Sequence, residues 1–282
     1  MNHVRVLRPA PAVYAFYDGR VDGYRFDDQP NWVDDGALSL GIASYAIVSG
    51  DAALVYDTHV SVEHARRIRA VLAEDGVRDF TVVLSHWHLD HVAGTEAFGD
   101  CEVIACERTL EVLTELRAAI ESGSLEGPPA IGPLVLPTTT FRTRRSLAIG
   151  DIQLELLHTE IHSDDAVVVW WPQMRLLLCG DTMEDTVTYV DEPARLPVHG
   201  QNLELLRELG PERILPNHGD PGVIAGGGYS DGLIGATQRY IDLLLSGAPL
   251  SLRDVVDELV SDDVHYYEPY ERVHRHNVER AL

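Results

Sequence analysis

The 282-residue sequence contains no lysine, so arginine supplies all 22 of its basic residues. Without lysine, the chain cannot form a lysine Schiff base with a carbonyl substrate or bind phosphate as a Walker-type loop does. Basic charge is scarce overall, because 45 acidic residues give a formal net charge of -23. Such a surface repels nucleic-acid phosphates and anionic membranes, and we expect neither as a partner.

Cysteines and long apolar runs are also scarce. Cys101, Cys106 and Cys179 form an odd set, which argues against a disulfide framework and favours buried, apolar thiols. No apolar run approaches the roughly 20 residues of a membrane-spanning helix. Residues 1–10 lack the apolar segment of a signal peptide. These features predict a cytoplasmic protein.

Apolar spacing predicts the elements of the first half of the chain. Residues 1–40 are rich in aromatic side chains mixed with Asp, Gly and Pro, and we expect irregular structure with short strands there. Two apolar runs around residues 49–52 predict a β-hairpin. Helical spacing predicts helices at 60–73 and 106–120, and the apolar run 80–84 predicts a buried strand.

The second half of the chain predicts a long loop, more strands and then helices. Residues 121–140 contain three Gly-Pro or Pro-Pro pairs, which predict a loop and a candidate lid. The patterns predict strands at 147–157, 166–171, 175–178 and 213–215, and helices at 202–209, 231–246, 251–260 and 269–281. We therefore expect one α/β domain over residues 1–282, with a core at about 43–220 and a helical C-terminal extension at about 231–281.

The run Ser85-His86-Trp87-His88-Leu89-Asp90-His91 directly follows the strand predicted at 80–84. Alternate residues of an extended chain point the same way, so His86 and His88 can approach one metal ion together. Where the loop turns, Asp90 and His91 can face a second ion beside the first. Three imidazoles and a carboxylate are costly to bury unless they bind something. This donor set suits zinc best, with iron and manganese as alternatives.

Three further polar segments follow predicted strands. They are His158–Asp165, Cys179–Thr182 and Pro216–Asp220. Each begins where an apolar strand leaves the core, which is the usual place for the active site of an α/β protein. We therefore expect these segments to supply further metal ligands.

The His-x-His-x-Asp-His run, the later histidine, the Gly-Asp pair and the final His-Gly pair resemble, in this order, the metallo-β-lactamase superfamily over residues 43–220. The resemblance implies a four-layer αββα sandwich with a helical C-terminal extension. It also implies seven ligands for two divalent ions: His86, His88 and His162 for one ion, Asp90, His91 and His218 for the other, and Asp181 bridging both. Asp57 matches the family's structural aspartate and would orient a ligand histidine from behind.

The choice of His162 depends on its spacing from His158. The family's usual His-Thr-Pro-Gly-His sequence places the ligand at the second histidine, which favours His162, although Glu160 and Ile161 replace the Pro-Gly pair here. The other histidines are expected to be solvated or structural. Among them, His59 and His199 are the two to examine near the site.

The resemblance implies a hydrolase in which two metal ions, zinc in the first instance, lower the pKa of a shared water towards about 7. The resulting hydroxide would attack a carbonyl or phosphoryl centre, with Asp90 as the catalytic proton carrier. The aromatic N-terminal stretch and Trp87 indicate a partly apolar pocket for a small-molecule substrate. A small ester, lactone or thioester is therefore expected.

Other functions stay open. Quorum-quenching lactonases carry a tyrosine three residues after the bridging aspartate, where this chain has Glu184; Tyr189 and Tyr229 are the candidate substitutes. A mononuclear iron enzyme of the persulfide dioxygenase type and a phosphodiesterase are the alternative enzymes. A scaffold that binds no metal is disfavoured, because all seven predicted ligands are present. The sequence also leaves a homodimer open.

Overall fold

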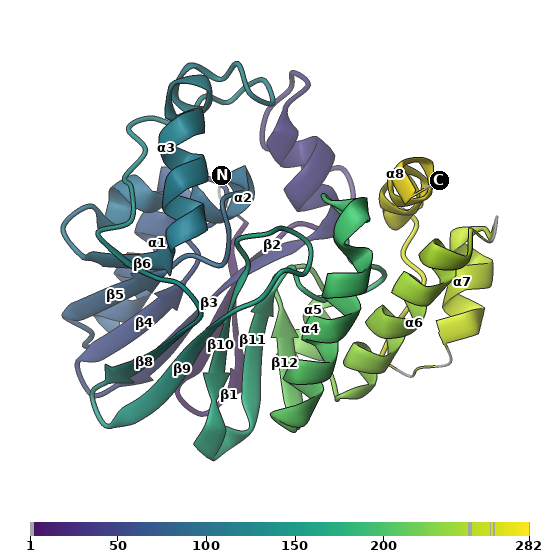
Figure 1. The fold of residues 1–282 in the computed structure, drawn as a ribbon. Coiled ribbons are helices and arrows are strands. Elements are labelled where there is room, and N and C mark those ends of the chain that lie inside the picture. Colours follow the sequence, from purple (N-terminus) through teal and green to yellow (C-terminus); the bar gives the residue numbers. More distant parts are fainter. Residues whose placement is uncertain (1–2, 248–249, 260, 262, 282) are drawn as a thin grey trace.

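The computed structural model describes residues 3–247, 250–259, 261 and 263–281. In it, two β-sheets face each other and helices cover their outer sides (Figure 1). The first sheet has seven strands, whose spatial order is their chain order: β1 (Arg5–Ala10), β2 (Val13–Asp18), β3 (Ile42–Ser49), β4 (Ala52–Tyr56), β5 (Asp79–Val83), β6 (Glu102–Cys106) and β7 (Thr139–Phe141). The second sheet has five strands, in the spatial order β12 (Arg213–Pro216), β11 (Leu176–Gly180), β10 (Val167–Trp171), β9 (Ile152–His158) and β8 (Arg144–Ile149).

Strand β3 illustrates why the two sheets lie in the middle of the molecule. Its alternate side chains point to opposite faces, and both faces are buried. Tyr45 and Ile47 pack in the apolar cluster shared with the second sheet, whereas Ile42 and Ala46 pack in the cluster beneath the outer helices. A strand that is buried on both faces has an almost continuous apolar sequence, as β3 has.

Helices α1 (Val62–Glu74) and α3 (Glu107–Ser122) cover the first sheet, and α4 (Leu196–Glu208) and α6 (Gly232–Ser246) cover the second (Figure 1). Ser61 caps the start of helix α1, because its side chain accepts a hydrogen bond from the backbone N–H of His64. The structure also has α2 (Leu89–Val92), α5 (Pro221–Ala225), α7 (Leu252–Leu259) and α8 (Tyr270–Ala281), with short helical turns at Val33–Leu38, Thr95–Phe98, Pro172–Met174 and Pro193–Arg195.

This architecture confirms the expected α/β sandwich with a helical C-terminal region. Two element predictions were wrong in detail. The single strand expected at 147–157 is the hairpin β8–β9, which turns at Gly150 with a φ of +52°. The apolar alternation shifts from odd to even positions at the Gly150-Asp151 pair, which is the signal that marks this turn. The helix expected from residue 202 begins at Leu196, because the proline and glycine in its first turns resemble a loop.

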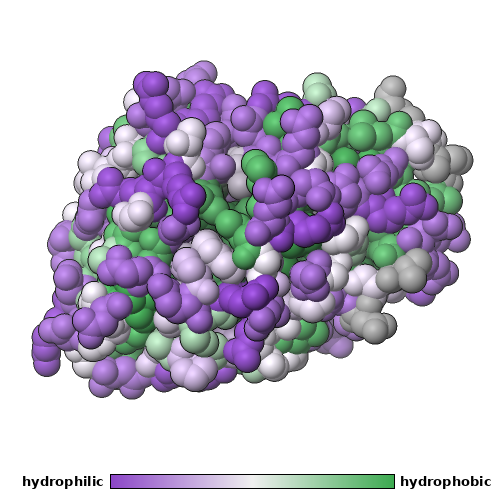
Figure 2. Space-filling model, turned by 60° about the horizontal axis from the view of Figure 1, so that its bottom comes forward, coloured by the Kyte–Doolittle hydropathy of each residue, from purple (hydrophilic) through white to green (hydrophobic). Residues whose placement is uncertain are grey.

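The molecular surface is mostly polar on the face drawn in Figure 2, where apolar side chains show only in patches between hydrophilic ones. Within the described ranges, no helix has both the length and the apolar character that a membrane crossing requires. The cysteines Cys101, Cys106 and Cys179 are free; Cys106 and Cys179 are buried, as expected, whereas Cys101 is only half-buried.

Candidate metal centre

The seven predicted ligands come together at one edge of the two sheets. The parallel neighbours β4 and β5 end there, and so do the parallel neighbours β11 and β12. Carboxyl ends of parallel strands meet at the same edge, so the segments that follow them become neighbours. The loop after β5 carries His86 to His91, Asp181 follows β11, His218 follows β12, and His162 lies in the loop after β9.

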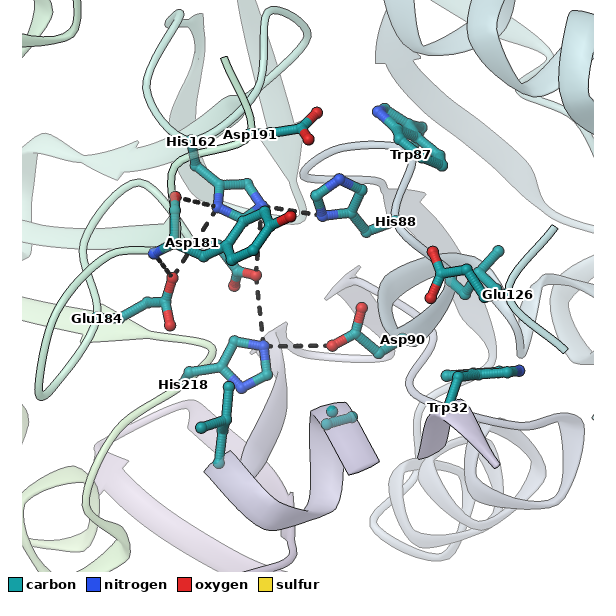
Figure 3. Close-up of a pocket in the computed structure, with 15 residues that line it drawn as sticks. Trp32, Trp87, His88, Asp90, Glu126, His162, Asp181, Glu184, Asp191 and His218 are labelled. Carbon is teal, nitrogen blue, oxygen red and sulfur yellow. Dashed lines mark hydrogen bonds and ion pairs between the residues drawn. The ribbon is translucent and has the colours of Figure 1, made fainter. Parts of the chain in front are cut away.

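The first set of ligand atoms is formed by three histidines. His86, His88 and His162 offer ring nitrogens that all lie within 4.8 Å of one another. Nε2 of His162 faces Nδ1 of His88 at 2.9 Å (Figure 3). Burial lowers the pKa of both His88 and His162 to about 4, so both imidazoles are neutral at pH 7, which is the form that binds a metal ion.

The second set combines a carboxylate with two histidines. Asp90, His91 and His218 also place their ligand atoms within 4.8 Å of one another. Asp90 Oδ2 lies 3.2 Å from His218 Nε2, and Asp90 Oδ1 lies 3.4 Å from His91 Nε2. Burial opposes charge on both histidines, but the carboxylates of Asp181 and Asp90 raise the pKa of each well above its usual value. A cation therefore competes with protons for these two nitrogens.

Asp181 lies between the two sets. Its Oδ2 atom is 3.1 Å from Nε2 of His91 and 3.4 Å from Nε2 of His218. The same oxygen is 3.7 Å from Nε2 of His86 and 3.8 Å from Nε2 of His162. One carboxylate oxygen therefore faces nitrogen atoms of both sets.

Three of the predicted ligand histidines are held from behind by oxygen atoms. Nδ1–H of His162 donates to the carbonyl of Tyr189 at 3.0 Å, and Nδ1–H of His218 donates to the carbonyl of Gly41 at 2.7 Å. His86 donates from Nδ1 to Ser85 Oγ at 2.8 Å. These bonds fix each ring and leave its Nε2 facing the centre, as second partners of metal-binding histidines do.

Asp57 performs the same task for His91. The carboxylate is fully buried, and its Oδ2 accepts the Nδ1–H of His91 at 2.9 Å. Asn217 Nδ2 donates to the same oxygen at 2.6 Å, and Ser85 N donates to Oδ1 at 2.6 Å. Asp57 thus lies behind His91, which is one of the predicted ligands. Sequence reasoning missed Asn217, whose only signal was its place directly before His218.

The donor set fits divalent cations. His86 Nε2 and Asp181 Oδ1 are buried, and neither has a hydrogen-bond partner within the described part of the chain. Leaving such atoms without a partner is costly, which a bound cation would relieve. Five imidazoles and two carboxylates also match the ligand preference of zinc, with iron and manganese as alternatives.

A cavity of about 300 Å³ opens above these ligands. Aromatic side chains of Trp32, Trp87 and Tyr189 form part of its wall, together with Leu40. The loop predicted at 121–140 contributes Glu126, so this candidate lid does border the site. In Figure 3, Trp87, Glu126 and Trp32 lie on one side of the cavity, across from Glu184 and His218.

Glu184 is a site residue that sequence reasoning noted only as a missing tyrosine. It lines the cavity and forms a further candidate metal-binding group with His162 and Asp181. Burial and the nearby charge of Asp181 raise the pKa of Glu184 to about 8. Its Oε2 accepts the hydroxyl of Tyr270 at 3.0 Å, and its Oε1 accepts the backbone N–H of Tyr189 at 2.8 Å.

Of the other candidates that the sequence offered, Tyr189 lines the cavity and the rest lie outside its wall. His158 Nε2 bonds to the carbonyl of Asp164 at 2.9 Å instead of facing the ligands. His59 and His199 are buried but do not line the cavity. Of the two candidate tyrosines, Tyr189 lines the cavity, whereas the Tyr229 hydroxyl is buried and bonded to Asp185.

Comparison with known proteins places this geometry in a family. Residues 39–218 match the family model described as the metallo-beta-lactamase superfamily. A linear primary-alkylsulfatase from Pseudomonas sp. is 24% identical over 221 residues, which cover 62% of this chain and 41% of that protein. The chain therefore spans less than half the length of that relative. A beta-lactamase-like protein 2 homolog from Caenorhabditis elegans is 23% identical over 229 residues, covering 79% of this chain and 72% of that protein.

Solved structures resemble the chain along most of its length. A metallo-beta-lactamase from Pontibacter korlensis superposes with a TM-score of 0.63 at 20% sequence identity, covering 85% of this chain and 99% of that one. At this level of identity the likeness shows the fold.

Proposed function

The chain belongs to the metallo-β-lactamase superfamily, and within it we propose a hydrolase that uses two divalent cations, zinc first, to cleave a small ester, lactone or thioester. In this proposal His86, His88 and His162 would hold one cation, Asp90, His91 and His218 would hold the other, and Asp181 would contact both. The single observation that carries the proposal is the position of Asp181 Oδ2, within 3.8 Å of ligand nitrogens from both sets.

Each part of the site has a chemical task in the proposed reaction. Bound cations would polarise a carbonyl and lower the pKa of water towards about 7. The side chain of Asp90 is 18% exposed and lines the cavity, so its carboxylate can accept a proton from attacking water and return it to the leaving group. The apolar wall around Trp32 and Leu40 excludes water from the rest of the bound substrate.

The proposed substrate class has two supports besides the ligands. The cavity of about 300 Å³ has the size of a small-molecule site. A relative with similar sequence is named as an alkylsulfatase, which is an enzyme that cleaves an ester of an alcohol. Ester cleavage is therefore the reaction type that we propose, with a carboxylic acyl group in place of sulfate.

The test is a substrate panel measured on the full chain after chelation and after reloading with zinc. The panel contains carboxylic esters, lactones, thioesters, phosphodiesters and alkyl sulfates. We expect zinc-dependent hydrolysis of at least one carboxylic ester class, and an Asp181→Ala variant should lose activity by about a thousandfold or more. Asp151→Ala, at an exposed turn between β8 and β9, is the matched control and should stay within about twofold.

Two outcomes would overturn the proposal. Full activity in chelated protein would remove the cations from the reaction. One iron per chain with sulfur-dependent oxygen uptake would instead support the dioxygenase alternative, and cleavage confined to phosphodiesters would support a phosphodiesterase.

A further inference from the structure

The outer wall of the cavity carries negative charge without a basic side chain to balance it. Glu126 is exposed and the Asp191 side chain is 30% exposed, so both lie outside the buried ligands at the floor. Both line the cavity. No arginine of the described ranges lines this cavity, and the sequence contains no lysine. A substrate that enters therefore meets two carboxylates before it reaches the ligands.

The nearby basic side chains do little to neutralise this wall. Arg280 Nη1 lies 4.0 Å from Asp191 Oδ1, and the Arg280 side chain is 47% exposed. An exposed pair at this distance is weak and screened by salt. No ion pair joins Glu126 to a basic side chain in the part of the chain that the structure describes. Within the described ranges, Glu126 therefore has no basic partner and Asp191 has only this exposed one.

Aromatic rings lie beside these carboxylates. Trp32, Trp87 and Tyr189 all line the cavity. Trp32 Nε1 donates to the carbonyl of Pro129 at 3.0 Å, which ties the ring to the loop that carries Glu126. Figure 3 shows Glu126 between the two tryptophans on one side of the cavity. Carboxylates next to aromatic faces are the chemistry that recognises an alkylammonium group.

The cavity of about 300 Å³ has room for a small ligand, and the charge of the chain favours one with positive charge. The formal net charge of -23 would attract cations over distance and repel anions, even with two divalent ions bound.

From these observations we propose that the site prefers esters that carry an ammonium group, which would lie between Glu126, Asp191 and the two tryptophans. The proposal rests on the proposed ester hydrolysis and names its substrate class. Anionic esters, including sulfate esters, are disfavoured because they meet the two carboxylates at the entrance.

Three acetate esters of matched shape test the preference on zinc-loaded protein. They are acetylcholine, its uncharged isostere 3,3-dimethylbutyl acetate, and the anionic 2-sulfoethyl acetate. We expect kcat/KM for the cationic ester to exceed that of the uncharged isostere by about tenfold, which corresponds to about 1.4 kcal/mol. The anionic ester should be the slowest of the three.

Two double variants separate the local effect from overall charge. Glu126→Gln with Asp191→Asn should bring the cationic-to-uncharged ratio of kcat/KM close to one. Glu115→Gln with Glu208→Gln removes the same charge from exposed positions outside the cavity and should keep the ratio. A wild-type ratio of one or less, or equal ratios in the two double variants, would overturn the proposal.

A binding measurement keeps this test separate from the test of hydrolysis. Calorimetry compares choline with uncharged 3,3-dimethylbutanol on the zinc-loaded chain. One outcome would support the cation site and contradict the hydrolase proposal. In it, no acetate is cleaved, choline binds about tenfold more tightly than 3,3-dimethylbutanol, and only the Glu126→Gln, Asp191→Asn variant loses this difference. Equal binding of the two alcohols would contradict the cation site whatever the hydrolysis result.

Discussion

Replacing Asp57 with asparagine tests how far the metal centre depends on the network behind it. The two carboxylate oxygens of Asp57 accept three hydrogen bonds, from Ser85 N, His91 Nδ1 and Asn217 Nδ2. Asparagine has the same shape but turns one of these oxygens into an NH2 group. In either orientation of the amide, this NH2 faces at least one N–H donor inside a fully buried site.

The size of the effect follows from the lost bonds. A buried hydrogen bond to a charged group contributes about 1.5–3 kcal/mol, so we expect an Asp57→Asn loss of about that size in unfolding free energy. Loss of the partner that orients a ligand histidine lowers metal affinity by about 10–100-fold. This corresponds to about 1.4–2.7 kcal/mol in zinc binding.

The assay is competition for zinc against a coloured chelator, combined with thermal unfolding with and without zinc. Asp79→Asn is the matched control, because Asp79 is exposed at the start of β5 and should leave both measurements unchanged. Zinc affinity within twofold of wild type in Asp57→Asn would refute the role of Asp57 in orienting His91 towards a cation.

Two further predictions concern stability. His199 is buried, and burial lowers its pKa to about 4. Between this lowered pKa and the usual value of about 6.5, only the unfolded chain protonates the imidazole, so the free energy of unfolding falls as the pH falls. His199→Leu should therefore remove about 2 kcal/mol of the loss in unfolding free energy between pH 7 and pH 5, as measured by urea denaturation. Equal losses in both proteins would contradict this cause. Gly94→Ala should lower the melting temperature, because the added Cβ would collide with the carbonyl oxygen of Thr58. Gly235→Ala is the contrasting variant: its Cβ has open space in α6, so it should add about 0.5–1 kcal/mol to the free energy of unfolding. Thermal unfolding measures both glycine variants, and a stabilised Gly94→Ala would contradict the packing argument.

The sequence patterns indicated that the segments carrying the candidate ligands follow apolar strands, whereas the choice of the seven residues came from the resemblance to the family's motifs. In this fold the carboxyl ends of the parallel strands lie at one sheet edge. The strands predicted before His86, Asp181 and His218 therefore indicate that these residues, although far apart in sequence, lie close together. The histidine spacing after β9 also indicated His162 in preference to His158.

The rest of the site depends on contacts that no local pattern encodes. Glu184 becomes a cavity residue because Tyr270, from the start of α8, donates to it across 86 positions of sequence. Glu126 reaches the cavity through a loop whose path is fixed by Trp32, another distant residue. Such pairings arise only when the chain has folded, and neither residue belongs to a motif.

Zinc content and position together test the central claim most directly. The zinc-loaded, dialysed chain should contain two zinc ions by mass spectrometry. Anomalous diffraction at the zinc edge should place one ion beside His86, His88 and His162 and the other beside Asp90 and His218. A chain that binds no metal, a single ion, or ions elsewhere on the surface would contradict the account.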